Sequence, residues 1–196
     1  MRDLADGVTR FQREVFPARA ELFAHLAAHH APHTLFIGCS DARVGPELIT
    51  GSEPGELFVV RTAGNLVPAY TPGSDGVAAS IEYAVAVLGV REIVVCGHSA
   101  CGAMTALAEG HDLGTAPAVA GWLRHADASL ARTAPGTDVP TLVRENVRAQ
   151  LANLATHPSV ARALADGSVR LHGWVFDIAT GRVEELAATD RTPSHA

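Results

Sequence analysis

The sequence has no long apolar run and few cysteines. No stretch of its 196 residues approaches the roughly 20 apolar positions that a membrane span needs. The N-terminal segment, MRDLADGVTRFQREVF, carries charges throughout and lacks the apolar core of a signal peptide. Three cysteines are an odd and sparse set, which fits a reducing compartment better than a disulfide framework. We therefore expect a cytoplasmic protein that contacts no membrane.

A surplus of basic residues is also missing. The chain has 15 Lys and Arg against 21 Asp and Glu, a formal net charge of −6, so we expect no nucleic-acid partner. A hydrophobic fraction of 47% with 18% charged residues excludes a disordered chain. The length predicts a single domain over 1–196, large enough to fold without disulfides, in which 1–30 form an N-terminal helical arm.

Strand and helix patterns alternate along the chain. Short apolar runs bounded by turn residues predict buried parallel strands at 34–38, 57–61, 92–96 and 169–177. The segment 179–186 turns at Thr180–Gly181 into a strand that can pair antiparallel with the last of these. Helical patterns cover 3–16, 18–28, 76–90, 101–110, 117–130, 141–155 and 158–167. This alternation predicts an α/β fold with a central, mainly parallel sheet flanked by helices.

Two predicted helices differ in how their apolar residues are distributed. Segment 141–155 is amphipathic, and we expect Arg144, Glu145 and Arg148 to face solvent. Segment 76–90, which Ser74 or Asp75 can cap, is apolar almost all round. Because such a helix must be covered on nearly every side, we expect a second subunit to supply part of the cover.

Thiol and imidazole groups follow two of the predicted strands. Cys39 comes at the end of the first strand, and His98 and Cys101 follow the third. In an open parallel sheet, functional groups gather beyond the C-terminal ends of the strands, so these side chains converge if the strands are neighbours. Two thiolates and one imidazole suit zinc, and three protein ligands leave the open fourth position of a catalytic site. We predict one Zn²⁺ per chain.

Asp41 and Arg43 follow the first of these cysteines in the run CSDAR. A carboxylate beside a dication must either bind it or be held away from it, and a guanidinium holds a carboxylate through two parallel hydrogen bonds. We therefore expect Arg43 to hold the Asp41 carboxylate beside the metal site. Cys96 ends an apolar strand and is interpreted as a core residue.

The residues alone leave other interpretations open. Cysteines at strand ends often serve packing, and an Asp and an Arg two positions apart commonly form a weak surface ion pair. A zinc-stabilised interaction module without turnover would need only the three ligands. A thiol oxidoreductase would need two thiols placed for exchange, although four residues separate Cys96 and Cys101 in place of the two in C-x-x-C.

Several motifs resemble the β-class carbonic anhydrases: CSDAR, PGELFVVRTAGNLVP, GVAASIEYAVAVLGV and VVCGHSACGAM. The likeness spans essentially the whole chain and is strongest to plant enzymes and to bacterial members that accompany cyanase. The resemblance implies strand order 2-1-3-4 with an added antiparallel edge and an N-terminal helical arm. It also implies a homodimer or dimer of dimers that converts carbon dioxide reversibly to bicarbonate and a proton. A hydrolase of carbonyl sulfide or carbon disulfide on the same scaffold remains an alternative.

The resemblance places the family's zinc ligands on the same Cys–His–Cys set and its catalytic dyad on Asp41 and Arg43. Ala42, between the two dyad residues, stands where a Ser is usual. The family's regulated branch has a Trp and a Tyr around an Arg at a non-catalytic anion site, and the matching positions here are Phe36, Phe176 and Arg61. Because phenylalanine lacks a hydrogen-bond donor, we predict weak regulation by bicarbonate, with Asp41 held off the metal at neutral pH.

The resemblance also implies a substrate pocket. Its Phe and Tyr fall on Phe58 and Tyr83, both expected to reach in from the other subunit, while its Gln position holds His30. Phe58 and Val44 would offer an apolar surface to carbon dioxide. The N–H of Gly102, at a helix start, would bind an oxygen of bicarbonate. His30 can donate one hydrogen bond as the amide does, and it also titrates near neutral pH.

Overall fold

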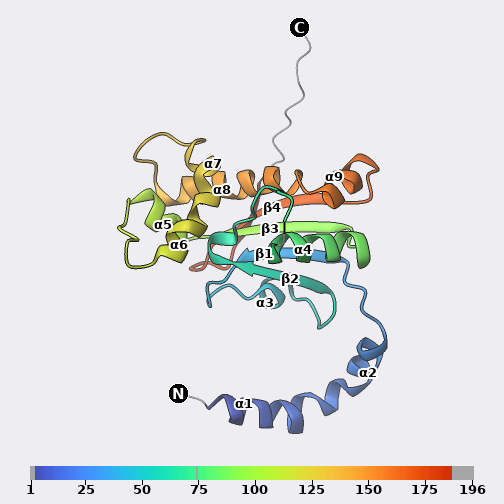
Figure 1. Cartoon of the computed structure of the whole chain (residues 1–196). Coiled ribbons are helices and arrows are strands. Elements are labelled where there is room, and N and C mark those ends of the chain that lie inside the picture. The colour runs from blue at the N-terminus through green and yellow to red at the C-terminus, as the bar shows by residue number, and fades with distance from the viewer. Residues whose placement is uncertain (1–2, 74, 187–196) are drawn as a thin grey trace. The chain divides into compact units, whose positions relative to one another are not determined.

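Five strands form one sheet in the order β2-β1-β3-β4-β5. Figure 1 shows β2, β1, β3 and β4 side by side in this order. The structure is a computed structural model that describes residues 3–73 and 75–186. The strands are β1 (Thr34–Cys39), β2 (Leu57–Thr62), β3 (Glu92–His98), β4 (Arg170–Phe176) and β5 (Val183–Leu186). The first four are parallel to their neighbours, and β5 pairs antiparallel with β4. The predicted fold class, strand order and antiparallel edge are confirmed.

The strand register brings the ends of β1 and β3 together. Cys39 lies opposite Thr62 of β2, and Gly38 lies opposite Cys96 of β3. Both central strands are buried almost throughout, as expected for strands covered on both faces. The segments that follow β1 and β3 therefore leave the sheet side by side at its C-terminal edge.

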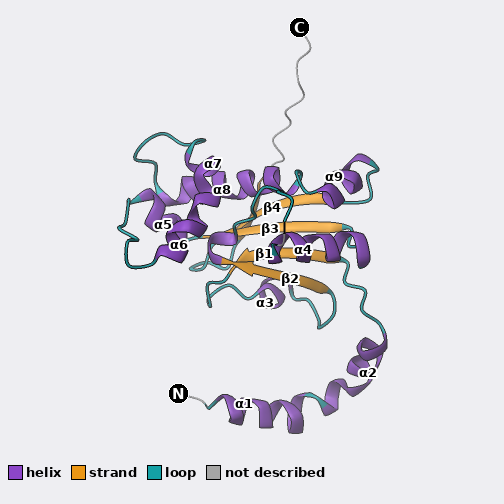
Figure 2. Cartoon of the chain, viewed as in Figure 1, coloured by secondary structure: helices purple, strands orange, loops and turns teal. Residues whose placement is uncertain are grey.

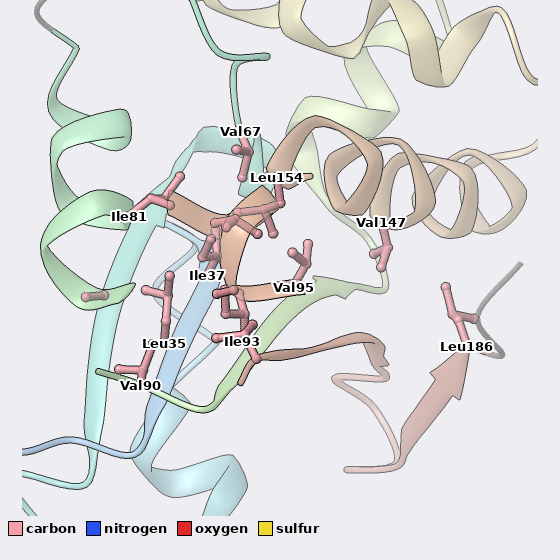
Figure 3. Close-up of a cluster of buried hydrophobic side chains, with 14 residues drawn as sticks. Leu35, Ile37, Val67, Ile81, Val90, Ile93, Val95, Val147, Leu154 and Leu186 are labelled. Atoms are coloured by element: carbon pink, nitrogen blue, oxygen red, sulfur yellow. The ribbon is translucent and has the colours of Figure 1, made fainter. Parts of the chain in front are cut away.

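Helices α4 (Gly76–Glu82), α8 (Val139–Leu154) and α9 (Pro158–Ala165) supply side chains to the main core on one face of the sheet (Figures 2 and 3). The strands contribute Leu35, Ile37, Ile93 and Val95, all fully buried, and the helices contribute Ile81, Val147, Leu154 and Val160. These strand residues lie two positions apart, because successive side chains of a strand point to opposite faces of the sheet.

The opposite face of the sheet carries a smaller apolar cluster. Phe36, Val94 and Cys96 are buried there, with Trp174 and Phe176 partly buried against them. Cys96 is fully buried, and this desolvation raises the pKa of its thiol to about 12. The interpretation of Cys96 as a core residue therefore agrees with its place in the fold.

Segment 117–130 is not the single helix expected from the sequence. It consists of α6 (Pro117–Leu123), a 3-10 turn over Arg124–Ala126 and α7 (Asp127–Leu130). Leu123, Ala126 and Ser129 are all buried, and their spacing of three matches the three residues per turn of a 3-10 helix. Helix α5 (Gly102–Ala108) lies within its predicted range, and α3 (Pro46–Thr50) was not predicted.

Helix α8 differs from its prediction at its start and on its polar face. It begins two residues early because the Asp138 carboxylate caps it, accepting a hydrogen bond from the Thr141 N–H at 2.7 Å. Glu145 and Arg148 do not face solvent freely: their side chains are 22% and 27% exposed and form an ion pair at 2.6 Å. Pairing lets both charges sit in the partly buried surface beside the sheet.

Helix α4 starts as its sequence predicts, but it ends at Glu82 and is not one continuous α-helix over 76–90. Asp75 caps it by accepting a hydrogen bond from the Val77 N–H at 3.0 Å, while Ser74 lies outside the described residues. The helix continues as a wider turn over Tyr83–Val87 and stops before Gly89, whose φ of 70° suits glycine. Tyr83 and Val87 are 43% and 66% exposed, so the apolar surface of this segment is only partly covered within one chain.

The residues before Pro32 form a compact unit of their own. It contains α1 (Leu4–Arg10), a wider turn over Phe11–Val15, a 3-10 turn over Pro17–Arg19 and α2 (Ala20–Ala28), in agreement with the two predicted helices. Phe11, Phe16 and Phe23 pack their rings together at centroid distances of 5.4–6.1 Å. The assignment of the whole chain to a single domain stays a prediction. None of the helices in the described ranges has the length and apolar character to cross a membrane.

Candidate metal centre

Two cysteines and one histidine converge at the C-terminal edge of the sheet. The sulfurs of Cys39 and Cys101 and a ring nitrogen of His98 all lie within 4.8 Å of one another. The three side chains are buried, with exposures of 6%, 1% and 0% for the two cysteines and the histidine. The predicted convergence of these residues is present because β1 and β3 are neighbours in the sheet.

The imidazole of His98 has one satisfied and one free nitrogen. Its Nδ1 lies 2.9 Å from the carbonyl oxygen of Ser99, and because a carbonyl only accepts, Nδ1 carries the proton. Its Nε2 is buried and has no hydrogen-bond partner within the described part of the chain. A buried nitrogen lone pair without a partner is costly, and a carbonyl behind the opposite nitrogen is the usual support of a metal-binding histidine. His98 therefore fits a metal ligand.

The hydrogen bond between the two sulfurs shifts their pKa values in opposite directions. A hydrogen bond from the Cys101 thiol, against the effect of burial, lowers the pKa of Cys39 to about 4. The same contact, together with burial, raises the pKa of Cys101. The Gly64 N–H also donates to Cys39 Sγ at 3.4 Å. Two cysteines and one neutral imidazole form a soft donor set that fits Zn²⁺, which would hold both sulfurs as thiolates.

The carboxylate of Asp41 is held beside this set by Arg43. Oδ1 accepts hydrogen bonds from the backbone N–H and the Nε of Arg43, both at 2.9 Å, and Oδ2 accepts one from Nη2 at 2.6 Å. These bonds hold the pKa of Asp41 well below its usual range, so the group is ionised. Oδ2 lies 4.0 Å from His98 Nε2, which places the carboxylate at the free nitrogen without a hydrogen bond to it.

Arg43 and Arg61 tie the loop after β1 to its surroundings. Arg43 Nη2 donates to the carbonyl of Ala100 at 3.1 Å and so links the loop after β1 to the loop after β3. Arg61 donates to the carbonyls of Cys39 at 3.0 Å, Asp41 at 2.6 Å and Val44 at 2.8 Å. The sequence did not predict this use of Arg61. The expectation of weak regulation by bicarbonate stays a prediction.

Comparison with known proteins identifies the family. The family model described as carbonic anhydrase matches residues 34–183. A carbonic anhydrase of Pseudomonas aeruginosa is 58% identical over 97% of this chain and 90% of its own length. The chain belongs to the β-carbonic anhydrase family.

Solved structures from the same family share the fold. The β-carbonic anhydrase CcaA superposes with a TM-score of 0.87 at 38% identity, covering 94% of this chain and 93% of that one. A β-carbonic anhydrase of the ascomycete Sordaria macrospora, described as tetrameric, superposes with a TM-score of 0.78 at 34% identity, covering 94% and 95%.

The residues that the family resemblance assigns to the substrate pocket are not all near the three metal-binding side chains. Phe58 pairs with Leu35 near the start of β2, four residues before Thr62, which lies opposite Cys39. At about 3.3 Å per residue, Phe58 is about 13 Å along the strand from the edge that carries Cys39. Its ring lies 5.9 Å from that of Tyr83. Within one chain, these two rings therefore form a pair away from the metal centre.

The other predicted pocket residues differ in their exposure. Val44 is 1% exposed and offers little surface to a ligand, although its carbonyl anchors Arg61. Gly102 is the exposed first residue of α5. His30 is exposed and belongs to the N-terminal unit. The substrate-binding roles of all these residues stay predictions.

Cys96 is not placed to form a redox pair with Cys101. Cys96 belongs to the apolar cluster on the face of the sheet that carries Phe36, whereas Cys101 packs with Cys39 in a separate cluster. All three cysteines are free thiols. This separation rules out Cys96 and Cys101 as the exchanging pair of a thiol oxidoreductase.

Sequence reasoning also missed the short turn Ala63–Asn65, which follows β2. Its Gly64 contacts Cys39, and its Ala63 carbonyl accepts a hydrogen bond from the indole of Trp122. The rule that directed attention to the ends of β1 and β3 applies equally to β2, because β2 lies beside β1. Gly64, just after the end of β2, was the feature of the sequence that could have pointed to this turn.

Proposed function

We propose that this chain catalyses the reversible hydration of carbon dioxide to bicarbonate and a proton, with one Zn²⁺ held by Cys39, His98 and Cys101. The observation that carries the proposal is the buried Nε2 of His98, which has no hydrogen-bond partner among the described residues and lies beside two sulfurs and an ionised Asp41. A bound zinc ion lowers the pKa of water toward about 7 and so supplies a nucleophile at neutral pH.

Asp41 orients the attacking water. As an ionised carboxylate it only accepts hydrogen bonds, so it would accept one from the water and orient an oxygen lone pair toward carbon dioxide without taking up the proton. Arg43 keeps Asp41 ionised and occupies both its oxygens, which holds the carboxylate away from the metal position. The Ala100 carbonyl fixes Arg43 in turn, so the orientation of Asp41 depends on both loops at the sheet edge.

Substrate and product contacts come from further residues. The ring of Phe58 provides the apolar side of the pocket, and the ring of Tyr83 stands beside it. The backbone of buried Val44 supports the site through its carbonyl, which accepts a hydrogen bond from Arg61. The N–H of Gly102 binds an oxygen of bicarbonate. The proton that leaves the site is assigned to His30, because an imidazole nitrogen can take up a proton.

The active assembly is a homodimer or a dimer of dimers in the cytoplasm. Phe58 lies about 13 Å along β2 from the edge that carries Cys39, and the Tyr83 ring packs beside it, which supports supply of both rings by a second copy. The exposed apolar side chains of Tyr83 and Val87 support an interface on this segment. The tetrameric Sordaria macrospora relative supports assembly beyond a monomer.

Stopped-flow measurement with a pH indicator tests the reaction. We expect the purified zinc-loaded protein to accelerate carbon dioxide hydration far more than the hydrolysis of carbonyl sulfide, assayed by sulfide release. A preference for carbonyl sulfide would replace the substrate assignment with the hydrolase alternative. A zinc-loaded protein that turns over neither substrate would favour a metal-stabilised interaction module.

A further inference from the structure

A single peptide group joins the indole of Trp122 to the sulfur of Cys39. The Ala63 carbonyl oxygen accepts a hydrogen bond from Trp122 Nε1 at 2.9 Å. The N–H of Gly64, which belongs to the same peptide unit, donates to Cys39 Sγ at 3.4 Å. Trp122 therefore contacts the sulfur indirectly, through one rigid and planar group.

The position of this peptide is tightly determined. Gly64 has a φ of 73°, and a Cβ built on it would lie 3.0 Å from Ala103 Cβ, so the site requires glycine. The next carbonyl, that of Gly64 itself, accepts a hydrogen bond from Asn146 Nδ2 at 2.9 Å. Helices α6 and α8 thus hold the successive carbonyls of Ala63 and Gly64. With both carbonyls held, the Gly64 N–H is directed at Cys39.

The two hydrogen bonds of the peptide act on each other. A donor at the carbonyl oxygen polarises the peptide group and strengthens the hydrogen bond that its N–H donates, by about 10–30% per bond. The acceptor at the far end is a sulfur that must be a thiolate to bind a metal. Strengthening the N–H bond stabilises that thiolate and withdraws charge from it.

We propose that Trp122 is a positioning residue of the metal centre, whose indole N–H sets the hydrogen bond on Cys39 through the Ala63–Gly64 peptide. This inference rests on the proposed function, because it takes Cys39 as a metal ligand. Trp122 is partly buried among the side chains that pack around Cys39 and Cys101, so its ring also contributes to packing. The experiment must therefore separate the effect of the indole N–H from the packing contribution of the ring.

Trp122→Phe keeps an aromatic ring and removes the donor. Trp174→Phe is the matched control, because Trp174 is the second tryptophan and lies in the cluster on the opposite face of the sheet. Zinc affinity is measured by competition with a chromophoric chelator. The sulfur-to-metal charge-transfer band is recorded after loading with Co²⁺. Thermal unfolding of both metal-free variants checks that they fold.

We expect Trp122→Phe to weaken zinc binding about tenfold. This is the low end of the loss in metal affinity, about 10–100-fold, that follows removal of a group that supports a metal ligand through hydrogen bonds. The Co²⁺ charge-transfer band moves to longer wavelength, because the sulfur regains charge. Trp174→Phe changes neither quantity. Equal zinc affinities and coincident bands in the wild type and Trp122→Phe would overturn the inference. A wild type that binds no metal would instead contradict the proposed function.

A second substitution covers the case in which Trp122→Phe repacks or fails to fold. Genetic encoding of 3-benzothienylalanine at position 122 preserves the shape of tryptophan and replaces the N–H with sulfur. We expect it to reproduce the lower affinity and the band shift. Wild-type values with this residue would show that Trp122 acts by packing alone, and the inference would be wrong.

Discussion

The guanidinium of Arg43 holds both carboxylate oxygens of Asp41, through Nε to Oδ1 at 2.9 Å and Nη2 to Oδ2 at 2.6 Å. The Arg43 backbone N–H adds a third hydrogen bond to Oδ1 at 2.9 Å. This geometry fixes the carboxylate at 4.0 Å from His98 Nε2 and keeps its pKa low. Because both carboxylate oxygens are held by Arg43, we expect the two residues to act as one unit.

Substitutions in this pair are therefore expected to be non-additive. Asp41→Asn and Arg43→Ala each lower kcat/KM for carbon dioxide by about a hundredfold, the scale of a lost proton-handling group. The double variant is about as slow as either single variant, because removing Arg43 already disorders Asp41. Arg43→Lys keeps the positive charge but cannot form the two parallel hydrogen bonds to Asp41. We therefore expect its activity to lie between those of Arg43→Ala and the wild type. A double variant with the product of the two losses would show independent roles.

Replacement of His30 tests the exposed histidine at the end of the N-terminal unit. A glutamine amide cannot take up a proton as an imidazole can, so His30→Gln is expected to change the shape of the turnover profile between about pH 6 and 8 in weak buffer. Zinc content stays unchanged. His29→Gln, at the neighbouring exposed histidine, is the control and leaves the profile as it is. Superimposable profiles for wild type and His30→Gln would exclude His30 from proton export.

His172 predicts a pH dependence of stability at the far edge of the sheet. Burial lowers its pKa, but hydrogen bonds to Glu92 at 2.7 Å and Glu185 at 3.1 Å outweigh this and raise the pKa above its usual value. Arg170 also pairs with Glu92 and limits the gain. A raised pKa adds stability below about pH 6.5, which is lost as pH rises through the folded value.

The free energy of unfolding should therefore fall on His172→Gln substitution by about 1 kcal/mol at pH 6, the scale of two partly exposed ion pairs. The difference shrinks as pH approaches 9. Urea unfolding of wild type and variant at both pH values measures it. His111→Gln, at a more exposed histidine paired with Glu109, serves as control. A difference that grows with pH would contradict the sign of the effect.

Shared active sites predict recovery of activity on mixing two inactive proteins. Cys101→Ser removes a metal ligand, and Phe58→Ala removes the ring that a partner is proposed to supply. In a mixed dimer, the Phe58→Ala chain keeps its metal and receives Phe58 from the Cys101→Ser chain. Random exchange in a symmetric dimer restores about a quarter of wild-type sites. Activity that stays at the sum of the separate proteins would place Phe58 in the site of its own chain.

The parts of the fold that depend on simple patterns were predictable from the sequence. Buried strands, the Asp75 cap and the convergence of Cys39 with His98 follow from apolar runs, helix-start chemistry and the edge rule for parallel sheets. The resemblance to a known family supplied the strand order. Without it, the residues alone left a structural zinc site and a packing role open.

Other features depend on tertiary contacts that a linear pattern does not carry. Arg61 is an ordinary strand residue in sequence, and its three carbonyl partners become neighbours only when β1 and β2 pair. The burial of Glu145 and Arg148 depends on the surface against which α8 packs. Trp122 is more than 50 residues from Ala63, and nothing local connects them.

Metal content determined together with hydration activity tests the central claim most directly. Elemental analysis of purified wild type, Cys101→Ser and Cys96→Ser compares a proposed ligand with a cysteine buried on the other face of the sheet. We predict one zinc per chain and rapid carbon dioxide hydration in wild type and Cys96→Ser, and loss of both in Cys101→Ser. A wild type without stoichiometric metal, or a Cys101→Ser protein that retains zinc and activity, would contradict the account.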